Sequence, residues 1–215
     1  MKHSPYLGMD TEVSIHHVPQ DIHDRNALRI VRFMRVFADK FFAKRYGHRA
    51  VVLETVAAVP GMVGGLLQHL KSIRHIRDDQ GWIHELLEEA DNERMHLMTF
   101  IKIAQPSRVE RWLIMVGQLV FYNIYFWTYL FAPRTAHRIV GYLEEEAVVS
   151  YTQYLEAIDA GLIENVPAPE IAIEYWQLSP DARLRDVVEV IRIDEARHRD
   201  VNHDFANKIK SGQHP

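Results

Sequence analysis

Apolar residues recur along most of the chain at spacings of three and four, which is the period of an amphipathic α-helix. Few stretches alternate apolar and polar residues, as a half-buried strand would. Gly and Pro residues divide the helical pattern into separate segments. The pattern therefore predicts an all-α protein with helices over residues 22–46, 50–76, 80–104, 108–131, 135–161 and 181–209. We expect a loop over residues 165–169, and SPD at 179–181 to mark the start of the last helix.

The first predicted helix, residues 22–46, combines a basic stripe with an apolar face. Its arginines recur at spacings of four, three and three, at Arg25, Arg29, Arg32 and Arg35. A helix of this kind can lie on an anionic membrane surface with its apolar side chains among the lipids. An ordinary surface helix of a soluble bundle has a similar pattern, so this segment alone leaves both alternatives open.

The segment WLIMVGQLVFYNIYFWTYLF, residues 112–131, has no charged side chain in 20 positions, eight of which are aromatic. Its length is just sufficient to span a bilayer. The aromatic side chains fit a helix at the level of the lipid headgroups at least as well. Gln118 and Asn123 would also be costly at the bilayer centre. A third alternative is a helix in the protein core.

Composition narrows the chemistry that this chain can support. Its 215 residues, 47% of them hydrophobic, suffice for one globular domain, which we expect over residues 22–215 after an N-terminal arm over residues 1–21. There is no cysteine, which excludes disulfides, thiolate metal sites and cysteine nucleophiles. Any metal must therefore be bound by nitrogen and oxygen atoms, for which the chain has 13 histidines and many carboxylates. Such ligands suit iron or manganese. The net charge of -4 does not predict a nucleic-acid partner.

Two Glu-x-x-His pairs stand out among the predicted helices. Glu93 and His96 form the pair in NERMHL, and Glu195 and His198 form the pair in DEARHRD. A spacing of three residues places both side chains of a pair on one face of a helix. One such pair is usually a surface ion pair, but two on separate amphipathic helices raise the possibility of a shared site.

Two further glutamates lie on inward faces of their helices. Stepping by three and four from Glu144 meets mostly apolar residues, whereas the same steps from Glu145 meet Arg138 and Glu156. Glu144 is therefore the member of the triple glutamate that we expect in the core. Glu54 shares its face with small residues, which allow close helix packing.

Four inward glutamates with two histidines form a recognisable ligand set. A buried carboxylate must be paired, protonated or bound to a metal. Two glutamates plus two Glu-x-x-His pairs, each from a different helix, are the ligands of carboxylate-bridged di-iron and di-manganese bundles. The sequence therefore predicts a dimetal site, and the alternative is a helical bundle with no metal.

Four segments carry a resemblance to a known family. LETVA (53–57), NERMHL (92–97), LEEEA (143–147) and DEARHRDVNH (194–203) resemble the signature segments of alternative oxidases, the cyanide-insensitive ubiquinol oxidases, over about residues 49–203. The resemblance implies a ferritin-like four-helix bundle with two non-haem iron ions per chain. It further implies a homodimer bound to one membrane leaflet, which reduces dioxygen to water with ubiquinol and pumps no protons.

The resemblance also assigns individual roles. The implied iron ligands are Glu54, Glu93, His96, Glu144, Glu195 and His198. Tyr151 matches the redox-active tyrosine of the family, and Asn92, His137, Trp176 and Asp194 match positions around the metals. The implied quinol pocket comprises Arg49, Leu53, Leu143 and Ala147, with Ser150 where the family has a threonine. The regulatory cysteine of plant members is absent.

Helical geometry bears on how the chain meets the membrane. If residues 112–131 spanned the bilayer alone, Glu93 and Glu144 would lie on opposite sides and could not share a site. We therefore expect this helix and 22–46 to be two additional interfacial helices in one leaflet. Residues 1–20 show neither a signal peptide nor a transit peptide. This leads us to expect a bacterial protein on the cytoplasmic face of the inner membrane, or a mature fragment on the matrix side of the mitochondrial inner membrane.

Three other functions remain as alternatives at this point. A di-iron quinone hydroxylase and a plastoquinol-type oxidase would use similar ligands and a similar substrate. A ferritin-like iron-binding protein would use the ligands without a quinone. The basic helix and the aromatic segment argue against iron storage, because a soluble cage has no need of a membrane face.

Overall fold

The computed structural model describes residues 13, 15–42, 46–105 and 107–213. It contains seven helices: α1 (Ile22–Phe42), α2 (Tyr46–His75), α3 (Trp82–Ala104), α4 (Arg108–Phe131), α5 (Pro133–Asp159), α6 (Glu170–Trp176) and α7 (Leu184–Lys210). No strand occurs among the described residues, where the β-structure is a single isolated bridge between Pro167 and Arg183. The all-α prediction is confirmed.

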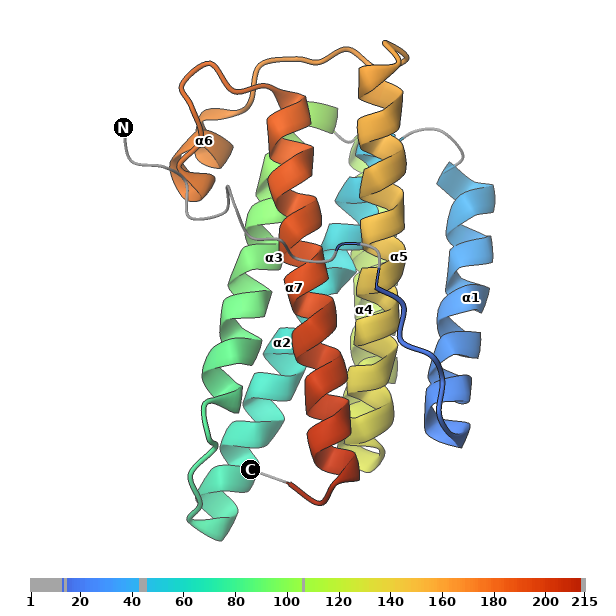
Figure 1. Cartoon of the computed structure of the whole chain (residues 1–215), viewed down its shortest axis with the longest axis vertical. Helices are drawn as coiled ribbons and strands as arrows, with labels where there is room; N and C mark the ends of the chain where they lie inside the picture. The colour runs from blue at the N-terminus through green and yellow to red at the C-terminus, as the bar shows by residue number, and fades with distance from the viewer. Residues whose placement is uncertain (1–12, 14, 43–45, 106, 214–215) are drawn as a thin grey trace.

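Helices α2, α3, α5 and α7 form a four-helix bundle, with α2 packed mainly on α3 and α5 packed mainly on α7 (Figure 1). Helix α1 packs on α5, and α4 lies against α2 and α5. Helix α6 lies beside α3, at the end of the bundle that the long connection between α5 and α7 covers (Figure 1). The two helices predicted outside the bundle are therefore α1 and α4.

The connection between α5 and α7 differs from the sequence-based expectation. The short helix α6 was not predicted, and α7 begins at Leu184 rather than at residue 181. The carboxylate of Asp186 accepts a hydrogen bond from the backbone N–H of Arg183 at 2.8 Å, which caps the helix there. Ala182 and Leu184 instead make backbone hydrogen bonds to the 166–168 segment, at 2.9 and 2.8 Å. The SPD segment itself forms a turn, in which the backbone N–H of Ala182 donates to the Ser179 carbonyl at 2.9 Å, so the helix starts only after it.

Buried polar side chains lie between two apolar clusters of the bundle. On α5, Tyr151 belongs to one cluster and Val140 to the other. On α2, Val51 belongs to the same cluster as Tyr151, and Val59 belongs to the same cluster as Val140. Glu54 and Glu144 lie on the turns between the two clusters. Because the apolar residues on either side of them are buried, the two carboxylates are held in the middle of the bundle.

A polar network joins the N-terminal arm to α5 and α7. Glu145 accepts hydrogen bonds from the His16 side chain, from the His17 backbone N–H at 2.8 Å and from His203 at 2.9 Å. Arg138, which is 1% exposed, donates to His203 Nδ1 at 2.8 Å. The polar face that the sequence placed around Glu145 and Arg138 is thus covered by residues 15–21, which run between α5 and α1 (Figure 1).

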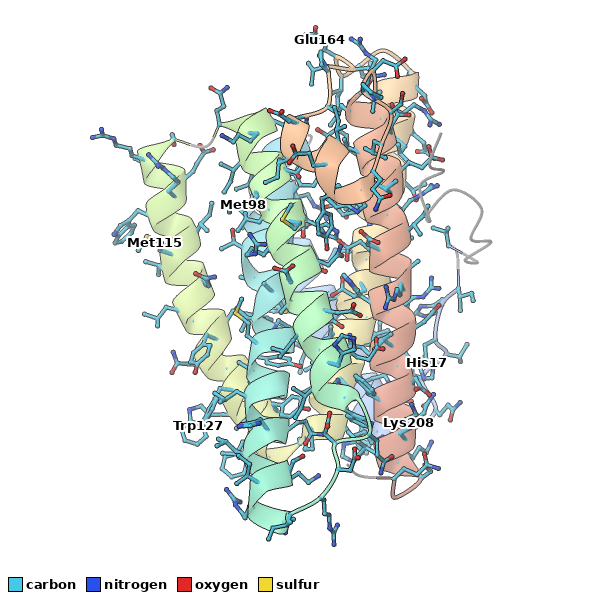
Figure 2. The ribbon with its side chains drawn as sticks, turned by 90° about the vertical axis from the view of Figure 1, so that its left-hand side faces the viewer. His17, Met98, Met115, Trp127, Glu164 and Lys208 are labelled. Carbon is cyan, nitrogen blue, oxygen red and sulfur yellow. The ribbon has the colours of Figure 1, made fainter. Side chains whose placement is uncertain are left out.

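Helix α4 exposes most of its apolar surface. Two of the described helices are long and apolar enough to cross a membrane, α2 over Arg49–His75 and α4 over Arg108–Phe131. In α2, 61% of an 18-residue apolar stretch is buried inside the protein. In α4, only 12% of a stretch of the same length is buried. Met115 and Trp127 point away from the bundle, on the side opposite His17 (Figure 2). The alternative of a core helix is therefore wrong for α4.

Helices α2 and α3 approach closely at Gly61. A Cβ atom added there would lie 2.3 Å from the Leu86 carbonyl oxygen and 3.0 Å from the Ala90 Cβ. Gly61→Ala should therefore separate the two helices and lower the free energy of unfolding by roughly 1–3 kcal/mol. Thermal unfolding of the purified protein measures this change.

The matched control is Gly117→Ala on α4, where an added Cβ meets no atom within 4 Å. Alanine favours helix over glycine, so this variant should be as stable as the native chain or more so. Equal melting temperatures for the two variants would contradict the close contact at Gly61.

Candidate metal centre

Four glutamates, one from each helix of the bundle, meet in its interior. They are Glu54 on α2, Glu93 on α3, Glu144 on α5 and Glu195 on α7, with exposed fractions of 2, 0, 5 and 1%. Glu144 faces the centre, whereas Glu145 faces the arm and Glu146 pairs with Arg35. The phase predicted for the triple glutamate therefore agrees with the structure.

His96 lies at the middle of this carboxylate cluster. Its Nδ1 atom is 3.3 Å from Glu54 Oε2, 3.2 Å from Glu93 Oε2 and 3.2 Å from Glu195 Oε1. One donor atom from each of these four residues lies within 4.8 Å of the others. Such a spacing allows several of these atoms to bind one cation.

His198 completes a second set of donor atoms beside the first. Its Nδ1 atom is 2.7 Å from Glu93 Oε1 and 4.0 Å from Glu195 Oε2. Glu93 and Glu195 thus each direct one oxygen toward His96 and the other toward His198. Carboxylates that face two nitrogen ligands in this way are suited to bridging two cations.

The electrostatics of the cluster show a shortage of positive charge. Burial and the neighbouring carboxylates raise the pKa of Glu54 and of Glu144 well above the usual value for glutamate. Burial would also raise the pKa of Glu93, but His96 and His198 outweigh it and hold this pKa well below the usual value. Burial would lower the pKa of His198, but the adjacent Glu93 outweighs it and raises this pKa to about 9. Two histidines do not compensate four buried carboxylates.

The donor atoms themselves fit a metal. Six buried atoms make no hydrogen bond: Glu54 Oε2, both oxygens of Glu93, His96 Nδ1, Glu195 Oε2 and His198 Nδ1. Buried polar atoms are normally hydrogen-bonded, so several atoms that lack a hydrogen bond and converge on one position require an explanation. Oxygen and imidazole ligands for two cations provide it.

Asp194 orients His96 from outside the cluster. Its Oδ2 atom lies 3.4 Å from His96 Nε2 and accepts hydrogen bonds from Trp176 Nε1 at 2.7 Å and from Asn92 Nδ2 at 3.0 Å. A carboxylate on one imidazole nitrogen directs the other nitrogen at the metal position. Asn92, Trp176 and Asp194 are thus brought together beside His96, and their role around a metal stays a prediction.

Tyr151 contacts the cluster directly. Its hydroxyl donates a hydrogen bond to Glu54 Oε1, and its ring stacks on Phe100 at a centroid distance of 5.8 Å. Burial and the adjacent Glu54 raise the pKa of Tyr151 well above its usual value, so it remains a phenol at neutral pH. The side chain is held by packing and aimed at a predicted ligand.

His137 reaches the centre only through other residues. Its Nδ1 lies 3.0 Å from Asn202 Oδ1, and its Nε2 lies 3.1 Å from the Tyr129 hydroxyl. Asn202 in turn donates to Glu89 Oε2 at 2.7 Å. Burial lowers the pKa of His137 to about 4 and raises that of Glu89 to about 7. His137 is therefore a neutral member of a hydrogen-bonded chain.

Glu89 and Asn202 were missed by the sequence analysis. Each lies four residues from a predicted ligand, Glu89 before Glu93 and Asn202 after His198. A step of four along a helix keeps a side chain on the same face, so this spacing was the available signal.

An apolar cavity of about 520 Å³ ends at the carboxylate cluster. The five residues of the predicted quinol pocket all line it, namely Arg49, Leu53, Leu143, Ala147 and Ser150. Tyr151, Glu54 and Glu144 form its inner end, and α1 and α4 contribute Val31, Met34, Ile114 and Phe121. The cavity thus connects the cluster with the two helices outside the bundle.

Comparison with known proteins shows which family this chain resembles. A family model described as Alternative oxidase matches residues 8–207. The "Ubiquinol oxidase, mitochondrial" of Batrachochytrium dendrobatidis (strain JAM81 / FGSC 10211) is 58% identical over 201 residues, 94% of this chain and 64% of that protein. The "Alternative oxidase 3, mitochondrial" of Glycine max is 60% identical over 206 residues, 96% of this chain and 63% of that protein.

A third relative agrees with these two. The "Ubiquinol oxidase 2, mitochondrial" of Arabidopsis thaliana is 58% identical over 204 residues, 95% of this chain and 58% of that protein. The chain thus spans less than two thirds of the length of these three relatives. The family model covers nearly the whole chain and includes every residue of the carboxylate cluster, and the chain belongs to the alternative oxidase family.

Proposed function

We propose that this protein oxidises ubiquinol and reduces dioxygen to water at a di-iron centre. The observation that carries the proposal is the meeting of a six-residue Glu and His cluster with an apolar cavity about 520 Å³ in volume. The balanced reaction takes two ubiquinol molecules and one dioxygen to two ubiquinones and two waters. The names of the mitochondrial relatives, ubiquinol oxidase and alternative oxidase, support this substrate.

Two iron ions per chain would be held by Glu54, Glu93, His96, Glu144, Glu195 and His198. When bound, the iron supplies redox chemistry and open positions for dioxygen. Glu93 and Glu195 would each offer one oxygen beside His96 and the other beside His198. Asp194 would hold the imidazole of His96 in the tautomer that presents Nδ1.

The apolar cavity would bind the quinol and exclude water. Leu53, Leu143 and Ala147 provide an apolar surface for the ring and tail. Arg49 and Ser150 are polar groups in the same lining that can hold the quinol oxygens. A ligand site with an apolar wall and a few placed polar groups fixes the orientation of its ligand.

Tyr151 would act as a one-electron donor next to the metals. Breaking the O–O bond of dioxygen takes four electrons, of which one would come from this phenol. When Tyr151 loses an electron, its hydroxyl proton would pass to Glu54 Oε1 along the existing hydrogen bond. A quinol would later restore both the electron and the proton.

Helices α1 and α4 would anchor the protein in one leaflet. Large exposed apolar residues gather on α4, at Trp112, Met115, Leu119, Ile124, Trp127 and Phe131. Helix α1 adds exposed Ile30 and Phe33 and an arginine stripe for anionic headgroups. The relatives favour the mitochondrial inner membrane, and the cytoplasmic face of a bacterial membrane stays a prediction without support from them.

Association into a homodimer is a further part of the proposal. Met62, Leu66 and Leu70 recur every four residues on α2 and are exposed, as is Leu87 on α3, whose side chain lies beside Gly65 of α2. Two copies that cover these side chains would remove them from water. The oligomeric state in detergent tests this part.

Product analysis separates the proposed oxidase from its alternatives. The oxidase forms water and an unmodified quinone, a hydroxylase inserts oxygen into the quinone ring, and an iron-storage protein forms ferric mineral. The apolar cavity supports a quinone substrate over storage, because mineral formation needs no such cavity. Quinol-dependent oxygen uptake with cyanide present is the direct measurement.

Replacement of single glutamates tests the ligand assignment. Glu144→Ala should reduce iron from about two ions per chain to about one or none, because its carboxylate faces the cluster. Glu145→Ala is the matched control, and its iron content should be close to native. This variant should unfold at a lower temperature, because His16 and His203 lose their acceptor. Elemental analysis decides between them, and loss of iron in Glu145→Ala alone would refute the assignment.

Tyr151→Phe tests the proposed electron donor. The change keeps the ring and removes the hydroxyl, so iron content should persist while quinol oxidation falls about tenfold or more, a barrier increase of about 1.4 kcal/mol. Tyr142→Phe is the control, because this buried tyrosine lies on the same helix and its hydroxyl has no hydrogen-bond partner. Native turnover in Tyr151→Phe would leave this residue a role in packing alone.

Leu119→Glu tests the membrane-binding face. Leu119 is 64% exposed on α4, so a charge there should remove roughly 1.5–3 kcal/mol of apolar burial in lipid and weaken vesicle binding about tenfold or more. Leu162→Glu makes the same change at a side chain that is 79% exposed beyond the end of α5, and should bind vesicles as the native chain does. Equal binding by both variants would argue against α4 as the anchor.

Protease cleavage of sealed vesicles tests the single-leaflet geometry. The loops at 76–80 and 161–169 lie at opposite ends of the bundle (Figure 1). Both should be cut from the same side of the membrane if α4 lies in one leaflet. Cleavage of the two loops from opposite sides would show instead that a helix crosses the bilayer.

A further inference from the structure

A second cleft, of about 370 Å³, opens between α3, α6 and α7 and shares no lining residue with the apolar cavity. Its lining is mostly polar and acidic. The carboxylates are Glu85, Glu88, Glu89, Asp91 and Asp194, and the basic groups are His84, Arg197 and His198. The cleft therefore offers an aqueous approach to the cluster from the side opposite the quinol pocket.

The cleft runs from exposed to buried residues. At its mouth, the side chains of Glu85, Glu88 and Asp91 are 40, 52 and 59% exposed. At its inner end, Glu89 and His198 are 4 and 6% exposed. His198 Nδ1 is also one of the proposed metal ligands, so the inner end of the cleft is the wall of the metal centre.

Glu89 lies between the mouth and the centre with an unused oxygen. Its Oε2 atom accepts a hydrogen bond from Asn202, whereas its buried Oε1 atom makes none. Asn92 Oδ1, in the same lining, is likewise buried without a hydrogen bond. Two unsatisfied acceptor oxygens at the end of an acidic cleft are what a hydrated cation would bind.

The apolar cavity is a poor route for a metal ion. Moving a divalent cation along a wall of leucine, valine and alanine side chains would remove its water without replacing those contacts. The acidic cleft provides oxygen ligands at each depth. A cleft lined by one sign of charge also raises the local concentration of the opposite ion.

We propose that this cleft is the entry path through which the hydrated ferrous ion reaches the metal centre. The proposal rests on the proposed di-iron function. Glu85 and Glu88 attract the cation at the mouth. Glu89 Oε1, one helical turn before Glu93, and Asn92 Oδ1 bind it transiently further in. Arg197 lies 3.7 Å from Glu85 and 3.4 Å from Glu88, so it offsets part of this attraction.

The loading rate of the metal-free protein tests the path. The purified chain is stripped with a chelator under reducing conditions and mixed with Co²⁺, a redox-stable probe whose visible absorption changes on binding to the centre. The double variant E85Q/E88Q should load about 3–10 times more slowly at low salt and reach the native cobalt content. The difference should shrink at high salt, where exposed charges are screened.

Three further variants test separate steps of the path. E156Q/E164Q makes the same change in net charge at exposed residues outside the cleft, and its loading rate should match the native rate. R197Q removes the cation between Glu85 and Glu88, so its loading should be faster than native. E89Q should load slowly at both low and high salt, because the buried inner site is little screened.

The outcomes separate this inference from the proposed function. Native loading rates in both E85Q/E88Q and E89Q, with full cobalt content, would refute the path and leave the metal centre intact. A reduced final cobalt content in E85Q/E88Q would make these residues ligands and also refute an entry role. If the native chain bound no cobalt at all, the metal centre itself would be refuted together with the path.

Discussion

The structure depends on the burial of four carboxylates at one point, where each helix of the bundle places a glutamate against the other three. Four such groups repel one another and lose their hydration, so the arrangement is stable only with compensating positive charge. His96 and His198 supply part of it, and Asp194 fixes the direction of His96. In the proposed function, two cations would supply the remainder, and metal binding and folding of the bundle would then be interdependent.

Two cavities of opposite character approach this cluster from different sides. The apolar one lies between α1, α2, α4 and α5, where a lipid-soluble substrate would enter, and the acidic one lies between α3, α6 and α7. Glu145 binds the arm at His17, and Arg138 donates to Asp24 of α1 at 2.9 Å, so this network holds the arm and α1 against the bundle. Helix α1 is one wall of the apolar cavity. A polar network remote from the cluster thereby maintains the shape of the proposed substrate site.

Some parts of the fold could not be read from local pattern because non-local contacts determine them. Helix α6 is a single short helix without enough residues to show a period, and hydrogen bonds to the 166–168 segment set the start of α7. The surroundings of Glu145 depend on an arm about 130 residues earlier in the chain, since His16 and His17 provide its partners. Periodicity carries no information about which distant segment covers a helix face.

Spacing along the chain was sufficient to identify the six long helices among the described residues, the two Glu-x-x-His pairs and the choice of Glu144 over its neighbours. This follows because a helix converts a step of three or four residues into a shared face, whatever surrounds it. Which side chains contact one another around the cluster could be seen only in the packed bundle. The link from His137 through Asn202 to Glu89, the acidic cleft and the exposure of α4 all arise where separate helices meet, and the distance between helices is set by packing rather than by sequence period.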